Sequence, residues 1–307
     1  MFTSFNARAM GLDLSAEQTL DMASVAGFDG VDLLVRDLVE RGEDPATVRA
    51  RMDDLGLRGG AWPLPVNWRG DAEGFSRDMA RLPRLAEAAR MMGLLRTGTW
   101  VMPESPDHPE GDDPTVLATH RASLVALHVD RLGAIARILA QHESRLGLEV
   151  IGVATSRTGH GVPFVHRLMD LDFLMDVLCK ESPNVGILLD GFHLYAAGES
   201  IEAGLVWGVE RIVWVHVADL PASSPQDRAQ ILDQERGLPG ENGAVDSGRL
   251  LARLDDLGYD GPVTAEPLSA CKSLANLGPE GKARAVVAAL RSAWPHRVSR
   301  GFPRINP

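Results

Sequence analysis

Four polar residues stand at the ends of short apolar runs, and their types suit a divalent cation. They are Glu149 in LGLEVIG, Asp190 in VGILLDGFH, His216 in RIVWVHVAD and Glu266 in GPVTAEPLS. Burial alone does not require a strand of Val, Ile and Leu to end on a carboxylate or an imidazole. Three carboxylates and one imidazole at one point would make an oxygen-rich site with one nitrogen, suited to Mn²⁺, Mg²⁺, Co²⁺ or Zn²⁺.

Each of these residues also has a purely structural interpretation. Glu149 could cap the helix that follows, and Asp190 could form a turn with the next glycine. His216 could be a satisfied core histidine, and Glu266 an edge residue before a proline. The four nevertheless end the fifth, sixth, seventh and eighth predicted strands, so the structural interpretation needs four coincidences. We therefore predict one shared metal site.

The elements that must position these residues alternate along the chain. Apolar runs predict strands at 2–10, 30–34, 57–65, 95–103, 146–152, 185–193, 211–219 and 261–269. Periodic apolar residues and caps predict helices at 16–28, 44–56, 74–93, 124–145, 170–182, 200–208, 245–258 and 281–294. Ser15 with Gln18 forms a capping-box pattern, and Asp44 precedes a proline at a first helical position. Pro83 predicts a kink or a helix start.

Eight strand–helix units over 307 residues favour a (β/α)₈ TIM barrel. The strands show little apolar–polar alternation, which is typical of parallel strands buried on both faces. No Gly-x-Gly-x-x-Gly follows the first strand, so a dinucleotide-binding fold has no support. We predict a single barrel domain over residues 1–295 and a C-terminal tail at 296–307, which would be a surface strap or a contact in a homo-oligomer.

Composition excludes several functional classes. The net charge of −11 argues against a nucleic-acid partner, because phosphate binding requires basic surfaces. The chain contains 2 cysteines, which indicates a reducing compartment. It shows no signal peptide and no apolar segment of the roughly 20 residues that span a bilayer. We therefore expect a cytoplasmic protein with no membrane partner.

Three long loops, at 108–120, 153–171 and 220–243, leave the C-terminal ends of predicted strands. Barrel enzymes build their sites at that end. Trp62, Trp68 and Trp100 follow strand ends there. They could form an apolar wall for a sugar ring or pack in the core.

The combined motifs resemble a known family over nearly the whole chain. The chain is similar to the xylose isomerase-like TIM barrels, specifically their sugar isomerase and epimerase branch, which includes ketose 3-epimerases, inosose dehydratase and hydroxypyruvate isomerase. The matching residues are Glu149, the Asp-x-x-His of Asp190 and His193, the His-x-x-Asp of His216 and Asp219, the Arg-x-x-Pro-Gly-Glu from Arg236 to Glu241, then Asp246 and Glu266.

The resemblance implies one divalent ion, Mn²⁺ first, held by the four residues at the strand ends. It also implies that Glu149 and Glu266 move protons from opposite faces of a bound keto sugar. His193 and Arg236 match positions that bind substrate oxygens, although they could instead be a structural histidine and a solvated loop arginine. The chemistry fits independently, because a cation that polarises a carbonyl acidifies the neighbouring C–H.

Two departures qualify this resemblance. Ketose 3-epimerases usually carry another acid shortly after the fifth-strand ligand, but the stretch here reads VIGVATSRTGH. The segment between His216 and Arg236 is also longer than is usual in those enzymes. Arg157 or His160 could contact an acidic or larger substrate, or lie in a solvated loop. No Lys/Arg cluster or glycine-rich cradle indicates a phosphorylated substrate.

The sequence therefore predicts a metal-dependent isomerase or epimerase acting on a carbohydrate through an enediolate. The alternative is a lyase that loses a β-hydroxyl or β-alkoxyl group after the same proton abstraction, as an inosose dehydratase or a keto-glycoside β-eliminating enzyme would. Two remote alternatives are a non-catalytic sugar-binding barrel and an apurinic endonuclease. The stretches GGAWPLP and RTGTWVMP lack the histidines that the endonuclease's trinuclear zinc centre needs.

Overall fold

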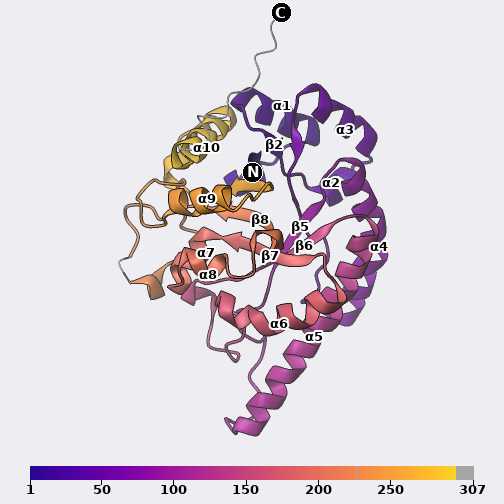
Figure 1. Cartoon of the computed structure of the whole chain (residues 1–307), viewed down its shortest axis with the longest axis vertical. Helices are drawn as coiled ribbons and strands as arrows, with labels where there is room; N and C mark the ends of the chain where they lie inside the picture. The colour runs from indigo at the N-terminus through magenta and orange to yellow at the C-terminus, as the bar shows by residue number, and fades with distance from the viewer. Residues whose placement is uncertain (226, 295–307) are drawn as a thin grey trace, which may run out of the picture.

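A computed structural model describes residues 1–225 and 227–294, so the predicted tail at 296–307 lies outside the described residues. Within them, nine parallel strands form one sheet at the centre of the molecule, with helices outside (Figure 1). The strands are β1 (Phe2–Phe5), β2 (Gly30–Val31), β3 (Arg58–Gly59), β4 (Trp62–Pro63), β5 (Arg96–Trp100), β6 (Arg145–Glu149), β7 (Val185–Asp190), β8 (Ile212–Val217) and β9 (Pro262–Ala265). The helices are α1 (Ala16–Ala26), α2 (Val35–Glu40), α3 (Pro45–Asp54), α4 (Ala72–Met91), α5 (Pro114–Gln141), α6 (Leu168–Glu181), α7 (Gly191–Ala197), α8 (Ile201–Gly204), α9 (Ser247–Asp256) and α10 (Pro279–Ala293).

The sheet curls round and meets itself through one stretch of chain. Its order is β3-β2-β1-β9-β8-β7-β6-β5-β4, so β3 and β4 stand at its two ends. Only Gly60 and Ala61 separate these two short strands in the sequence. The third predicted strand, 57–65, is therefore split: its first half pairs with β2 and its second half with β5. Counted as one, they give the eight strands of the predicted TIM barrel.

A close approach of backbone to side chains requires glycine at the split. Gly60 donates its N–H to Val31 O at 2.9 Å. A Cβ on Gly60 would collide with Asp32 Oδ1 and Ser4 Oγ. The chain passes so close to these two side chains that only glycine fits here.

The helices follow the sequence closely, with a few differences. Ser15 and Gln18 form the predicted capping box, and Asp44 caps α3. Pro83 lies inside α4 and does not start a helix; buried Leu82 precedes it, and buried leucine and alanine side chains hold the turns that follow it. The helix α5 begins at Pro114 with Asp113 as its cap, so part of the loop predicted at 108–120 is helical. It reaches furthest from the barrel in Figure 1. The short helices α2 and α7 were not predicted. The helix α2 has no side-chain cap, and residues 191–193 of α7 lie in the predicted strand 185–193, which ends at Asp190 because its side chain caps α7.

The core lies mainly between the sheet and the surrounding helices. Trp62 and Trp68 are fully buried in it. Of the two interpretations, core packing therefore applies to both residues, because their buried rings offer no face to a sugar. Trp100 differs, since it is 40% exposed. In the described part of the chain, none of the helices combines the length and apolar character needed to cross a bilayer.

Candidate metal centre

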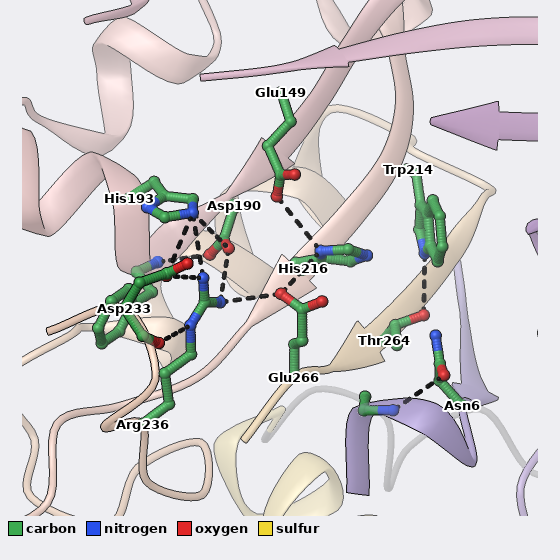
Figure 2. A network of polar contacts seen from close by, with 12 residues as sticks. Asn6, Glu149, Asp190, His193, Trp214, His216, Asp233, Arg236, Thr264 and Glu266 are labelled. Carbon is green, nitrogen blue, oxygen red and sulfur yellow. Dashed lines mark hydrogen bonds and ion pairs between the residues drawn. The ribbon is translucent and has the colours of Figure 1, made fainter. Parts of the chain in front are cut away.

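The four residues that end the predicted strands come together at one end of the barrel. Glu149 and Asp190 are the last residues of β6 and β7, and His216 is the penultimate residue of β8. Glu266 directly follows β9, where its N–H still donates to Val217 O at 3.0 Å. Figure 2 shows their side chains pointing toward one another. One ligand atom from each lies within 4.8 Å of the others.

Strand register explains this convergence. Asp190 and His216 are register partners on β7 and β8, and Glu149 pairs with Leu188, two residues before Asp190. Register partners on parallel strands face the same side of a sheet, and so do residues two apart on one strand. All these side chains therefore point to the inside of the barrel.

The imidazole of His216 lies between the two glutamates. Its Nδ1 is 3.5 Å from Glu149 Oε1 and 3.3 Å from Glu266 Oε2. Neither ring nitrogen makes a hydrogen bond with any described residue, although the side chain is almost fully buried. A buried imidazole without hydrogen bonds, flanked by carboxylates, fits the donor set of a divalent cation. These four residues would hold it.

Asp190 has two tasks. Its Oδ1 accepts the N–H of Phe192 at 2.8 Å and so caps α7, as the turn interpretation expected. Its Oδ2 stays directed toward the cluster, 3.8 Å from His193 Nε2. Because α7 starts at the strand end, its first turn places His193 beside the predicted metal ligands.

Arg236 is the cation that joins these residues. Its Nη1 donates to Asp190 Oδ2 at 2.7 Å and to Glu266 Oε2 at 2.9 Å. Its Nη2 donates to His193 Nε2 at 3.0 Å and to Asp233 Oδ1 at 2.6 Å. The side chain is 2% exposed, so it is not a solvated loop arginine. Asp233 was not identified from the sequence, where its only signal is a position three residues before Arg236.

Asp219 fixes the loop that carries Arg236. Its buried carboxylate accepts four backbone N–H groups, from Leu220, Asn242, Gly243 and Val245, at 2.6 to 2.9 Å. Its backbone pairs with Gly237 as an isolated bridge. The other motif acids are structural as well, since Glu241 accepts the N–H of Leu238 and Asp246 caps α9.

The charges of the cluster depend on one another. Burial raises the pKa of Glu149. Burial also opposes ionisation of Asp190 and Glu266, but Arg236 and His216 outweigh it and hold both pKa values below their ordinary range. Burial disfavours the imidazolium of His216, yet Glu266 and Glu149 together raise its pKa well above the ordinary value. The two glutamates thus stand in different electrostatic environments.

A chain of hydrogen bonds supports the centre from inside the barrel. Trp214 packs edge-on against the His216 ring, with 4.5 Å between ring centroids. Its Nε1 donates to Thr264 Oγ1 at 2.9 Å, and Thr264 donates to Asp32 Oδ2 at 2.7 Å. Asp32 also accepts hydrogen bonds from the Ser4 hydroxyl and from the N–H of Ala61. The sequence reasoning missed this network, since Asp32 follows a strand of only two residues.

Three comparisons connect the chain to known proteins. A 3-dehydroshikimate dehydratase from Pseudomonas putida is 29% identical over 254 residues, which are 81% of this chain and 35% of that protein. The chain thus spans about a third of the length of the curated relatives it matches.

Two solved structures share the fold. A xylose isomerase domain protein from Alicyclobacillus acidocaldarius is 25% identical with a TM-score of 0.77, covering 95% of this chain and 97% of that one. A 3-keto-D-glucoside 4-epimerase from E. coli is 17% identical with a TM-score of 0.66, covering 95% and 98%. A family model for the xylose isomerase-like TIM barrel matches residues 20–293, and the chain therefore belongs to that family.

Proposed function

We propose that this protein is a metal-dependent dehydratase acting on a small, hydroxylated cyclic keto acid of the 3-dehydroshikimate type. The observation that carries the proposal is the convergence of three carboxylates and the unbonded imidazole of His216 within 4.8 Å. The dehydratase relatives support the reaction class. Of the cations that suit this donor set we place Mn²⁺ first, with Mg²⁺, Co²⁺ and Zn²⁺ as alternatives.

The first step is removal of a proton from the carbon next to the carbonyl. A bound divalent cation would supply a Lewis acid that polarises this carbonyl. Glu149 is the group we assign as base, because Arg236 holds Glu266 and Asp190 but not Glu149. The ion-pair contact of Glu149 in the described residues is with His216, and Glu149 accepts no hydrogen bond from an arginine there. His193 and Arg236 lie beside the cluster, where they would bind substrate oxygens.

Loss of water completes the proposed reaction. The electron pair of the broken C–H bond forms a carbon–carbon double bond, and the β-hydroxyl leaves with a proton as water. The loop after Glu149, VIGVATSRTGH, contains no further acid, which distinguishes it from the ketose 3-epimerases that the sequence resembles. The proposal therefore ranks the lyase above the isomerase or epimerase, whereas the sequence alone favoured the isomerase or epimerase.

One observation favours isomerisation or epimerisation as the second candidate. Glu149 and Glu266 both approach His216 Nδ1, at 3.5 and 3.3 Å, so two carboxylates border the same space. A proton removed by one could be returned by the other on the opposite face of the substrate.

The test follows substrates by NMR in D₂O with metal-loaded protein. Loss of water from 3-dehydroshikimate supports the dehydratase, whereas deuterium exchange into ketoses or inososes without loss of water supports the second candidate. The variant Glu149→Gln should abolish either reaction, and Glu202→Gln, an exposed glutamate paired with Arg249, is the matched control. If the wild-type protein catalyses neither reaction with any substrate of this panel, the proposal is rejected.

A further inference from the structure

One arginine near the mouth of the barrel has no acidic partner. Arg69 is half-buried, and among the described residues no carboxylate lies within salt-bridge distance of it. Only burial shifts its pKa, which falls to about 10, so the guanidinium stays charged at neutral pH.

Arg69 packs against the end of β5, the strand next to the one that carries Glu149. Its guanidinium carbon lies 3.6 Å from the centre of the Trp100 ring. Trp100 ends β5 and is the register partner of Glu149 on β6. Because register partners face the same side of a sheet, the Trp100 ring is on the same side as the Glu149 carboxylate. Arg69 therefore packs on a ring whose strand is the neighbour of the strand that ends in Glu149.

The hydrogen bonds of Arg69 leave one edge of its head free. Its Nη1 donates to Trp100 O at 2.7 Å and to Thr99 Oγ1 at 3.1 Å. Thr99 Oγ1 also accepts a hydrogen bond from Trp68 Nε1 at 3.1 Å, which holds this oxygen in place. In residues 1–225 and 227–294, Nε and Nη2 of Arg69 make no hydrogen bond. Two parallel N–H donors on a fixed guanidinium match the two oxygens of a carboxylate.

We propose that Arg69, stacked on Trp100, binds the carboxylate of an anionic substrate whose keto group lies at the four-residue cluster. This inference rests on the proposed function and names the group that would orient its substrate. A carboxylate fits better than a phosphate, because a phosphate needs several cationic or backbone donors. No second charged side chain of the described residues perturbs Arg69.

The experiment separates carboxylate binding from turnover. The probes are 3-dehydroshikimate and its methyl ester, bound to the metal-loaded full chain and measured by calorimetry. The wild type should bind the acid about 10- to 100-fold more tightly than the ester, the range expected for one charge-assisted bidentate pair. Arg69→Met should reduce acid affinity by a similar factor and leave ester affinity unchanged. Arg77→Met, at an exposed arginine of α4, should change neither.

Each outcome bears on the inference. The inference is overturned, even if dehydration occurs, if the wild type binds the acid and the ester with similar affinity. It is also overturned if Arg69→Met shows the same ratio of acid affinity to ester affinity as the wild type. Arg69-dependent binding of the acid without turnover supports it while rejecting the proposed function. No binding of either probe rejects both. If Arg69→Met does not fold, Arg69→Lys keeps the charge but loses the paired donors, and it should show a smaller loss of acid affinity.

Discussion

The variant Arg236→Met should destabilise the metal-free protein and make it more dependent on a divalent cation. Arg236 is 2% exposed and pairs with Asp190, Glu266 and Asp233. Methionine fills part of the same volume but leaves these carboxylates without their shared cation. Breaking a buried ion pair by removing one partner costs about 3–5 kcal/mol.

The expected thermal shift follows from the size of the chain. An unfolding entropy of about 2.1 cal/mol/K per residue gives roughly 0.6 kcal/mol/K for 307 residues. A loss of 3–5 kcal/mol should therefore lower Tm by about 5–8 °C. A bound divalent cation would neutralise the carboxylate charges that the variant leaves unpaired, so saturating Mn²⁺ should raise the Tm of the variant by more than that of the wild type.

The assay is differential scanning calorimetry of both proteins, with chelator and with Mn²⁺. Arg131→Met is a matched control, because Arg131 donates to the carbonyls of Trp68 and Gly70 and makes no ion pair in the described residues. The reasoning is refuted if chelated Arg236→Met melts within about 2 °C of the wild type. It is also refuted if Mn²⁺ stabilises the two proteins equally.

Three further changes have defined outcomes. Glu149→Gln should lower bound metal and activity together, measured by elemental analysis and turnover; full metal content with full activity would remove Glu149 from the site. Asp219→Asn replaces one carboxylate oxygen by an NH₂ group, which faces two of the four backbone N–H donors, and should cost about 3 kcal/mol or more in urea unfolding, with reduced turnover; an unchanged midpoint would contradict this. His128 is buried against Trp68 and Phe164, and burial lowers its pKa from 6.5 to about 4. The unfolded state therefore binds the proton more readily, and the wild type should lose at most about 3 kcal/mol as pH falls from 6.5 to 4, a loss that His128→Leu should not show in unfolding titrations.

The sequence predicted the barrel and the strand-end residues because both depend on short-range patterns. Apolar runs that stop on Glu149 or Asp190 locate a strand and its end at the same time. Parallel register then brings the ends together, whatever the loops do. The barrel closure was not predictable in detail, because β3 and β4 are two residues each and their split depends on the packing of Gly60 against Asp32.

The partners of the centre could not be predicted because they come from distant loops. Asp233 pairs with His193, 40 positions away in the chain, in a loop after β8 that the Asp219 carboxylate helps to hold. Asp32 lies 232 residues from its partner Thr264. Trp62 and Trp100 both follow strand ends, but only tertiary packing decides that one is buried and the other 40% exposed.

The charges of the centre also determine where an anionic substrate can bind. Glu149, Asp190, Asp233 and Glu266 place four carboxylates around Arg236 and His216. Even with a divalent cation and a neutral, ligating imidazole, these acids leave the cluster without a spare positive charge. A substrate carboxylate would therefore be repelled there, and its binding group must lie apart from the acids. Arg69 meets this condition because its Nη1 bonds neutral acceptors and its stacking on Trp100 keeps it out of the ion-pair network. An arginine within reach of Glu149 would pair with it, lower its pKa and so weaken it as a base. The separation of Arg69 from Glu149 is what allows one site to bind a carboxylate and to remove a proton from the substrate's carbon.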